Sequence, residues 1–426
     1  MAKQIMLNPI ESKETHYGYG IEVEIDAKNI IYSHEGLNPG YHSIMFYNPK
    51  TKTTLVELSN ISPDKDQFID VMKKLEDNSK LQGEEKTAKK HEAAIEYPFI
   101  DEIYEEHKLV SGDIIKEPLI NIQKIKEEYQ LPAVGVGFII NGEPQGIAAT
   151  GLRKIGNTTP VTSTDKWHIG SCTKSMTATL VAILINNKKY PSLTWETKLK
   201  DFFDFKIHDD FQNITLKELL AHKSGIEDPK EWDEIEKLLS PLTNDMEIRA
   251  TLAKTFLENP ASYNAITSTE GHYSNIGYVI VGAVLEHLTK KSWEQLMKEE
   301  IFTPLEMHSA GFGSPANEKL ETPDQPWGHD EKDQPTYEDN ASWAGPAGTV
   351  HVTIADWLKY LKVHIDGSKG IDTKILPASG FHILHDSLEN NSDFTAGGWL
   401  SGEINGVKML QAIGSNSFNF AGVRVV

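Results

Sequence analysis

The sequence predicts a mixed α/β fold, of the α+β kind, in which the two ends of a domain close one sheet. Three observations predict it. Strand patterns fill residues 17–60 and 133–151, helical patterns dominate residues 171–301, and strand patterns return at residues 397–426. Runs of strands that flank a run of helices are typical of α+β folds, in which sheet and helices pack as layers.

The first strands are predicted as two pairs. Residues 17–25 alternate between apolar and polar side chains, residues 30–33 are apolar, and a turn-like segment separates them. Residues 41–47 and 53–58 form the second pair around an Asn-Pro-Lys turn. A helix is expected to follow at residues 63–77, where apolar side chains share one face.

The rest of the chain is predicted as a linker, a strand pair, a helical region and closing strands. Residues 78–112 are rich in Lys and Glu, which favours a solvated linker with one helix near residues 99–107. An Asn-Gly turn joins the strand at 133–140 to the next one at 146–151. Helices are expected at residues 120–129, 171–185, 216–220, 275–288, 293–301 and 353–366, and strands at 397–400, 407–413 and 420–426.

Composition excludes several classes of protein. The chain has 426 residues with a net charge of −20, which argues against a nucleic-acid partner because such binders need a basic face. Cys172 is the one cysteine, so there is no intrachain disulfide. The longest apolar stretches, 133–140 and 276–285, are shorter than the ~18 residues of a membrane span, and the first residues carry no signal-peptide pattern. The sequence assigns neither a compartment nor an oligomeric state.

A first chemical motif lies in residues 168–177 (HIGSCTKSMT), which hold Ser-x-x-Lys at the start of an apolar helix. Residues i and i+3 share one helix face, so Lys174 can reach Ser171 Oγ. A serine hydroxyl needs a base to become a nucleophile, and burial lowers the pKa of a lysine enough for that role. The alternative for this motif alone, a serine near a helix start beside a solvated lysine, is the commoner arrangement.

A second motif lies in residues 271–278 (GHYSNIGY), at a loop-to-helix junction. Tyr273 could serve as general base toward the serine and then as general acid toward the leaving group. Asn275 could bind a substrate carbonyl or Lys174. The alternative is an N-cap at Ser274 or Asn275 with Tyr273 packed beside it.

Together the two motifs resemble those of the serine β-lactamase and penicillin-binding-protein superfamily, and most closely the class C β-lactamase-like branch that includes esterases and D-aminopeptidases. Residues 219–226 (LLAHKSGI) are similar to that branch's Leu-Leu-x-His-x-Ser-Gly segment. Residues 343–350 (WAGPAGTV), followed by Asp356, are similar to its Pro-Ala-Gly segment. The resemblance covers residues 117–426.

The resemblance implies a β-lactamase/transpeptidase-like fold, with an antiparallel sheet flanked by helices and an all-helical insert. It implies that Ser171 is the acylated nucleophile, Lys174 its partner, Tyr273 the acid and base, and Asn275 a positioning group. The reaction would be acyl transfer followed by hydrolysis, on a small-molecule or peptide substrate, with no metal and no organic cofactor. The class A pattern, which has Ser-Asp-Asn and a Glu-x-x-Leu-Asn motif, is absent. A catalytic thiol at Cys172 is not expected.

The third motif of this superfamily, Lys/His-x-Gly on an edge strand, is altered here. In residues 410–416 (LQAIGSN) Gly414 and Ser415 fit, so the amide of Ser415 can serve with that of Ser171 as the oxyanion hole, but Ala412 replaces the cation. The cation binds a substrate carboxylate in this superfamily. Its replacement favours an ester or small amide over a β-lactam, although a D-amino-acid peptide or amide and a β-lactam stay open.

An intact version of the third motif, His34-Glu35-Gly36, lies near the start of the chain, and the segments after it resemble the end of the same domain. The predicted organisation is therefore a C-terminal piece of one such domain at residues 1–78, a charged linker at 79–116, and a second domain at 117–426 whose end is incomplete. A fragment of a tandem protein and a permuted domain are the two explanations. In either case the strand at 53–58 is expected to pair with the strand at 133–140 and fill a vacancy in its sheet, since unpaired strand edges are unfavourable. His34 and Ala412 then compete for the cleft, with residues 407–413 expected to hold the sheet edge.

Other motifs are weak. His91 begins a sequence that lacks the second histidine of a zinc helix, and the acidic segment 329–339 is expected to be a solvated loop. The rival function is a non-catalytic relative that binds a ligand or cell-wall peptide; the missing cation favours it and the intact Ser171, Lys174 and Tyr273 oppose it.

Overall fold

The computed structural model describes the backbone of strands β1 to β6 between residues 16 and 59, and most of the chain from 122 to 425. Within the second range it leaves out residues 125, 128–129, 141, 230–232, 264–271, 331, 387–393 and 405–406. The helix expected at 63–77 and the whole linker segment, with its helix near residues 99–107, lie outside the described residues. The division into a partial domain, a linker and a second domain stays a prediction.

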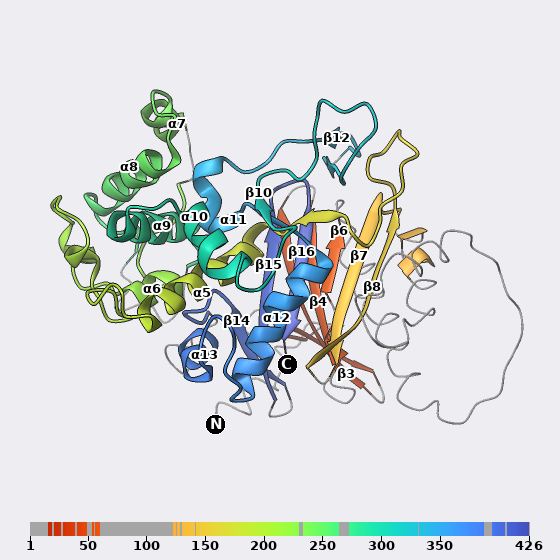
Figure 1. The fold of residues 1–426 in the computed structure, drawn as a ribbon, viewed down its shortest axis with the longest axis horizontal. Helices are drawn as coiled ribbons and strands as arrows, with labels where there is room; N and C mark the ends of the chain where they lie inside the picture. Colours follow the sequence, from red (N-terminus) through yellow and green to blue (C-terminus); the bar gives the residue numbers. More distant parts are fainter. Residues whose placement is uncertain are drawn as a thin grey trace, which may run out of the picture.

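The main sheet has six antiparallel strands, as the fold class requires (Figure 1). Its order is β14-β15-β16-β6-β7-β8. The strands are β14 (Leu400–Ile404), β15 (Val407–Ser415), β16 (Phe420–Val425), β6 (Val56–Ser59), β7 (Ala133–Ile140) and β8 (Glu143–Gly151). The chain thus combines strands from its two ends in one layer.

The predicted pairing of the strand at 53–58 with residues 133–140 is confirmed for residues 56–58, whereas Thr53 and Thr54 pair with residues 48 and 47 instead. Leu58 pairs with Gly135 of β7 on one side and with Ala421 of β16 on the other. β6 therefore fills the position between β7 and β16, whose inner edges would otherwise expose unpaired backbone groups.

The prediction that residues 407–413 hold the edge of the main sheet is wrong in part. β14 pairs with β15 from Leu400↔Gln411 to Ile404↔Val407, so β14 holds the outer edge along most of β15. The end of β15, from Ala412 to Ser415, runs past β14 and reaches the start of helix α5. A hairpin formed by β14 and β15 satisfies more backbone groups than a bare edge strand.

The early strands form a second, five-stranded antiparallel sheet in the order β1-β2-β3-β4-β5. Its strands are β1 (His16–Gly18), β2 (Ile21–Asp26), β3 (Asn29–Asn38), β4 (Tyr41–Asn48) and β5 (Thr53–Thr54). His34 lies in β3, which pairs with β2 and β4 and not with the end of β15. Its role as a site residue stays a prediction.

Helices cover the main sheet. α12 (Ile354–Ser368) packs on β7, where Gly135 and Gly137 leave room for it: a Cβ on Gly137 would lie 2.4 Å from Ile354 Cγ2. α5 (Thr173–Asn186) is buried along nearly its whole length, and α13 (Ala378–His385) packs against it. The described residues of the helix expected at 120–129 are helical.

The all-helical insert lies beside the sheet, on the left of Figure 1. It contains α6 (Leu216–Leu220), α7 (Asp233–Leu239), α8 (Asp245–Leu257), α9 (Asn275–Thr289) and α10 (Trp293–Met297), which runs into a π-helical turn at Lys298–Phe302. A buried ion pair joins α8 to α9, with Arg249 Nη2 2.6 Å from Glu286 Oε1. The sequence had not predicted α7 and α8.

A small sheet contains the strand that lies directly before the candidate site along the chain. β9 (Lys166–His168) pairs with β13 (Val350–Thr353), which also pairs with β10 (Gly311–Phe312). A two-stranded sheet, β11 (Gly328–His329) with β12 (Pro335–Thr336), lies in the segment that was expected to be a solvated loop. The short helix α11 (Gly345–Gly348) precedes β13 directly.

Candidate active site

The candidate nucleophile sits where the chain changes from a 3₁₀ turn at Gly170–Cys172 to helix α5. Lys174 lies one helical turn further on, and its Nζ is 2.9 Å from Ser171 Oγ. The first N–H groups of a helix have no partner within the helix, so the amide of Ser171 is free of intrahelical bonding. The local sequence alone thus brings the serine and the lysine together.

Lys174 is 2% exposed and donates to three acceptors. Besides Ser171, they are Asn275 Oδ1 at 2.7 Å and the carbonyl of Ala347 at 2.8 Å. Burial lowers the pKa of Lys174 to about 7, while the negative charge of Asp228 acts in the opposite direction. Near neutral pH this side chain is therefore divided between its charged and its neutral form.

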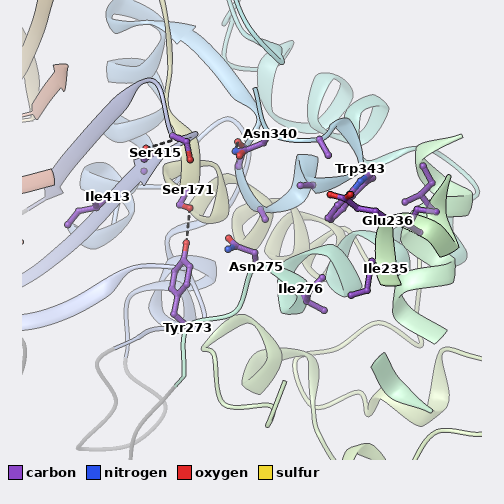
Figure 2. A pocket seen from close by; sticks show the side chains of 18 of the residues that line it. Ser171, Ile235, Glu236, Tyr273, Asn275, Ile276, Asn340, Trp343, Ile413 and Ser415 are labelled. Carbon is purple, nitrogen blue, oxygen red and sulfur yellow. Dashed lines mark hydrogen bonds between the residues drawn. The ribbon is translucent and has the colours of Figure 1, made fainter. Parts of the chain in front are cut away.

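Tyr273 reaches the same serine from the insert. Its hydroxyl donates to Ser171 Oγ at 2.7 Å. Although 44% of the residue is exposed, burial of the hydroxyl raises the pKa of Tyr273, and the hydrogen bond to Ser171 only partly offsets this. Tyr273 therefore keeps its proton in the free site, and Figure 2 shows its hydroxyl pointing to Ser171. Together with the contact from Lys174, this brings the three side chains to one point, as expected.

Helix α9 begins directly after Tyr273, which explains the position of the tyrosine. Ser274 caps the helix by accepting from the amide of Gly277 at 3.0 Å, and the amide of Ser274 donates to His222 Nδ1 at 3.0 Å. The His222 ring also packs on the Tyr273 ring, with centroids 4.6 Å apart. Burial holds the pKa of His222 well below its usual value, so the ring stays a neutral acceptor.

Asp228 is a site residue that the sequence analysis did not identify. Its Oδ2 accepts from Asn275 Nδ2 at 2.7 Å, and its Oδ1 accepts from the amide of Ile276 at 2.9 Å. These bonds orient Asn275 so that its Oδ1 faces Lys174. Asp228 lies 47 residues from Asn275 in sequence, and only the tertiary fold joins them.

The end of β15 lies against the nucleophile turn. Gly170 has a φ of +47°, and a Cβ on Gly170 would lie 2.3 Å from the amide nitrogen of Ser415. A Cβ on Gly414 would lie 2.5 Å from the amide nitrogen of Ser171. Both glycines are needed for this approach. Ser171, Gly414 and Ser415 line the same cavity.

A further polar cluster ties these two segments. His168 Nδ1 accepts from the amide of Gly170 at 3.1 Å, and its Nε2 lies 3.0 Å from Asp339 Oδ1. The same Asp339 oxygen accepts from Asn416 Nδ2 at 2.8 Å and from the amide of Asn340 at 2.6 Å.

The cavity beside Ser171 has a volume of about 920 Å³. Around Ser171 the lining is mainly polar, with Tyr273, Asn275, Asn340, Gly414, Ser415 and Ser417, together with Ile413 and Phe420. The other end, called the apolar end below, contains Ile235, Leu239, Ile248, Ile276 and Trp343, with Glu236 of the same helix as Ile235 and Ser240 directly after that helix. Figure 2 shows Trp343 and Ile235 across Asn275 from Ser171 and Ser415. Glu236 is the one charged residue among the described lining residues, none of which is Lys, Arg or His.

The described part of the chain contains neither a candidate metal cluster nor a candidate membrane span. No group of three or more His, Cys, Asp or Glu side chains there could hold a metal ion. None of its helices is both long enough and apolar enough to cross a membrane.

Comparison with known proteins adds the family. The beta-lactamase family model matches residues 121–398. Penicillin-binding protein 4 of Amycolatopsis lactamdurans is 25% identical over 71% of this chain and 79% of its own length. An unguisins hydrolase of Aspergillus campestris is 25% identical, over 47% of this chain and 37% of its own length.

Solved structures share the fold. A penicillin-binding protein homologue from Pyrococcus abyssi, described as octameric, aligns with a TM-score of 0.56 and 21% identity over 71% of each chain. The D-amino acid amidase of Ochrobactrum anthropi aligns with a TM-score of 0.51 and 20% identity, over 71% of this chain and 89% of its own.

Proposed function

The chain belongs to the beta-lactamase family, and from that premise we propose that it is a serine hydrolase that transfers the acyl group of its substrate to Ser171 and then to water. The observation that carries the proposal is the double contact on Ser171 Oγ, from Lys174 Nζ at 2.9 Å and Tyr273 OH at 2.7 Å. A relative named as a hydrolase supports it.

In the proposed acylation, the neutral amine of Lys174 takes the proton of Ser171 as Oγ attacks the substrate carbonyl. The lowered pKa of Lys174, about 7, supplies that neutral amine at physiological pH. The negative oxygen of the tetrahedral intermediate faces the amides of Ser171 and Ser415.

Collapse of the intermediate needs an acid. The hydroxyl of Tyr273 gives its proton to the leaving atom, and the ammonium of Lys174 then returns a proton to the tyrosinate. The raised pKa of Tyr273 favours this acid role, because the phenol is protonated before each turnover. Water completes the cycle by attacking the acyl-serine, with the same two groups exchanging its proton.

The proposed substrate is an ester or small amide in preference to a β-lactam. In this superfamily a cation on the strand of the third motif binds a carboxylate, and this chain has Ala412 at that position, 5% exposed and paired with Val423. The absence of basic residues among the described cavity residues supports the same choice. D-Amino-acid peptides and amides remain within the proposed class.

Covalent labelling tests the proposal. A fluorescent fluorophosphonate should label the wild-type chain once, and Ser171→Ala should abolish the label. Ser417→Ala, which changes an exposed serine of the same cavity, is the matched control and should label normally. A chain that hydrolyses no ester and accepts neither fluorophosphonate nor fluorescent penicillin would instead be a non-catalytic ligand-binding relative.

A further inference from the structure

The apolar end of the cavity is built by helix α7 and the turn that holds Trp343. Ile235 and Leu239 are four residues apart on α7 and so share one face of it. Ile248 of α8 lies beside them, and Trp343 completes the wall. Leu239, Ile248 and their neighbours form a small hydrophobic cluster distinct from the main core, so the wall has its own support.

The wall is also held in place by polar contacts. The carbonyl of Trp343 accepts from Arg249 Nη1 at 3.3 Å, and Ser342 Oγ donates to Asp245 Oδ1 at 2.8 Å. Arg249 is fixed in turn by its ion pair with Glu286. The surface offered to a substrate is therefore preformed, as apolar ligand sites usually are.

From this wall we propose the substrate class: an uncharged acyl compound that carries an apolar group of several carbons beside the scissile carbonyl, seated against Ile235, Leu239, Ile248 and Trp343. The inference rests on the proposed acyl transfer at Ser171. Glu236, the one charged side chain among the described residues that line the cavity, would repel a carboxylate at that end.

Two ester series test the inference, one for each side of the carbonyl. The first keeps p-nitrophenol as the leaving group and lengthens the acyl chain from acetate through butyrate to octanoate. The second keeps the acetyl group and changes the alcohol from phenol to naphthol. In at least one of the two series, kcat/KM should rise roughly fourfold for each methylene group, or the equal apolar area of a ring, that becomes buried. A flat or falling dependence in both series would overturn the inference.

A matched pair tests charge. p-Nitrophenyl pentanoate and the p-nitrophenyl monoester of glutarate have acyl chains of equal length and differ by one carboxylate. The pentanoate should be the better substrate, by about tenfold or more, since burial of an unpaired carboxylate is unfavourable. Faster hydrolysis of the glutarate would contradict the proposal.

Variants on one helix locate the subsite. Ile235→Ser should lower the ratio of kcat/KM for octanoate to kcat/KM for acetate, because the longer group loses an apolar contact. Leu238→Ser is the control, since Leu238 lies on the same helix, is 44% exposed and does not line the cavity. Equal effects from both variants would overturn the assignment. A chain that is labelled at Ser171 but shows no length preference refutes this inference alone, whereas an unlabelled chain refutes the proposed function as well.

A separate observation concerns the cluster around Asp339. One carboxylate oxygen accepts from Asn416, the residue after Ser415, and lies beside His168, which accepts from the amide of Gly170, the residue before Ser171. His168 Nε2 and Asp339 Oδ1 lie 3.0 Å apart, in contact but without the alignment of a hydrogen bond. The pair thus connects the two segments whose amides are proposed to bind the oxyanion.

The geometry points to His168 and Asp339 as positioning residues that set the separation of the Ser171 and Ser415 amides. The same loop continues to the other side of the site, where Asn340 Nδ2 donates to the carbonyl of Gly348 at 2.7 Å. A small displacement of either amide weakens stabilisation of the transition state more than binding of the substrate.

Asp339→Leu tests this role, with Glu338→Leu as control because Glu338 is the exposed neighbour in sequence. Asp339→Leu should lower kcat by about 10²-fold per fluorophosphonate-titrated site, change KM by less than about threefold, and weaken a boronic acid inhibitor in parallel with kcat. Asp339→Asn should restore most of the activity, since its amide oxygen can still accept from Asn416. A lower melting temperature or titrated fraction, with unchanged kcat per titrated site, would show a merely structural role and overturn the assignment.

Discussion

The rate of acylation is expected to depend on pH through the ionisation of Lys174. If the neutral amine is the base, the rate follows the fraction of Lys174 that has lost its proton. With a pKa of about 7 in place of the usual 10.5, that fraction is half at the pKa and falls about tenfold for each pH unit below it. Above the pKa the rate reaches a plateau, because the raised pKa of Tyr273 keeps the phenol protonated.

The variant Asp228→Asn tests this pH dependence, because it should change the pKa of Lys174 in a known direction. The negative charge of Asp228 raises the pKa of Lys174 against the larger effect of burial. Its removal should therefore lower that pKa further and move the acidic limb of the profile to lower pH. Glu227→Gln is the control, because Glu227 is its neighbour but pairs with His272 at the surface, 2.9 Å away, and it should leave the midpoint unchanged.

The assay is the rate of the pre-steady-state burst of p-nitrophenol release, with substrate in excess, followed from pH 5 to pH 10. The midpoint, and not the amplitude, is the readout, since loss of Asp228 also loosens Asn275 and lowers the maximal rate. A wild-type profile without a limb near pH 7, or a midpoint that moves upward in Asp228→Asn, would refute the assignment of Lys174 as the base.

Three further outcomes are expected. Tyr273→Phe should lower kcat by about 10²–10⁴-fold in steady-state assays, because the leaving atom loses its proton donor, and an unchanged kcat would contradict the acid role. Gly170→Ala should lose activity, since its Cβ would lie 2.3 Å from the amide nitrogen of Ser415. Gly156→Ala, also at positive φ but with nothing within 4 Å, should keep it, and equal losses would mean that backbone strain and not the contact is responsible. Arg249→Met should reduce the free energy of unfolding in urea by about 3–5 kcal/mol, because it leaves the buried carboxylate of Glu286 without its partner, and a change below about 1 kcal/mol would show that the pair is solvated.

The parts of the site that the sequence predicted are those determined by local geometry. Ser171 and Lys174 are three residues apart on one helix turn, so the motif alone predicted their contact. The arrival of Tyr273 at Ser171, from 102 residues away, was implied only by the resemblance of the two motifs to one superfamily. The vacancy beside the strand at 133–140 predicted the pairing with β6 for a similar reason, since strand edges need partners.

The parts that the sequence did not predict depend on contacts between distant segments. Asp228 and Asp339 lie in irregular loops, each next to another acidic residue, and nothing in the sequence distinguishes them from these neighbours before the fold brings them to Asn275 and His168. The Pro-Ala-Gly segment was identified only by its resemblance to the family. In the structure its Ala347 carbonyl accepts a hydrogen bond from Lys174, so the segment is part of the candidate site. The strand at the sheet edge was assigned wrongly because the hairpin partner β14 has a weak strand pattern.

The central claim is that Ser171 carries the acyl group during turnover. The most direct measurement is to quench the reaction with p-nitrophenyl octanoate in acid within the burst, digest the chain and determine the mass of the peptide that contains Ser171. The account predicts that this peptide gains the mass of one octanoyl group and that the adduct is absent from Ser171→Ala. In Tyr273→Phe the adduct accumulates if deacylation slows more than acylation. Release of p-nitrophenol without an adduct, or an adduct on any other residue, would contradict it.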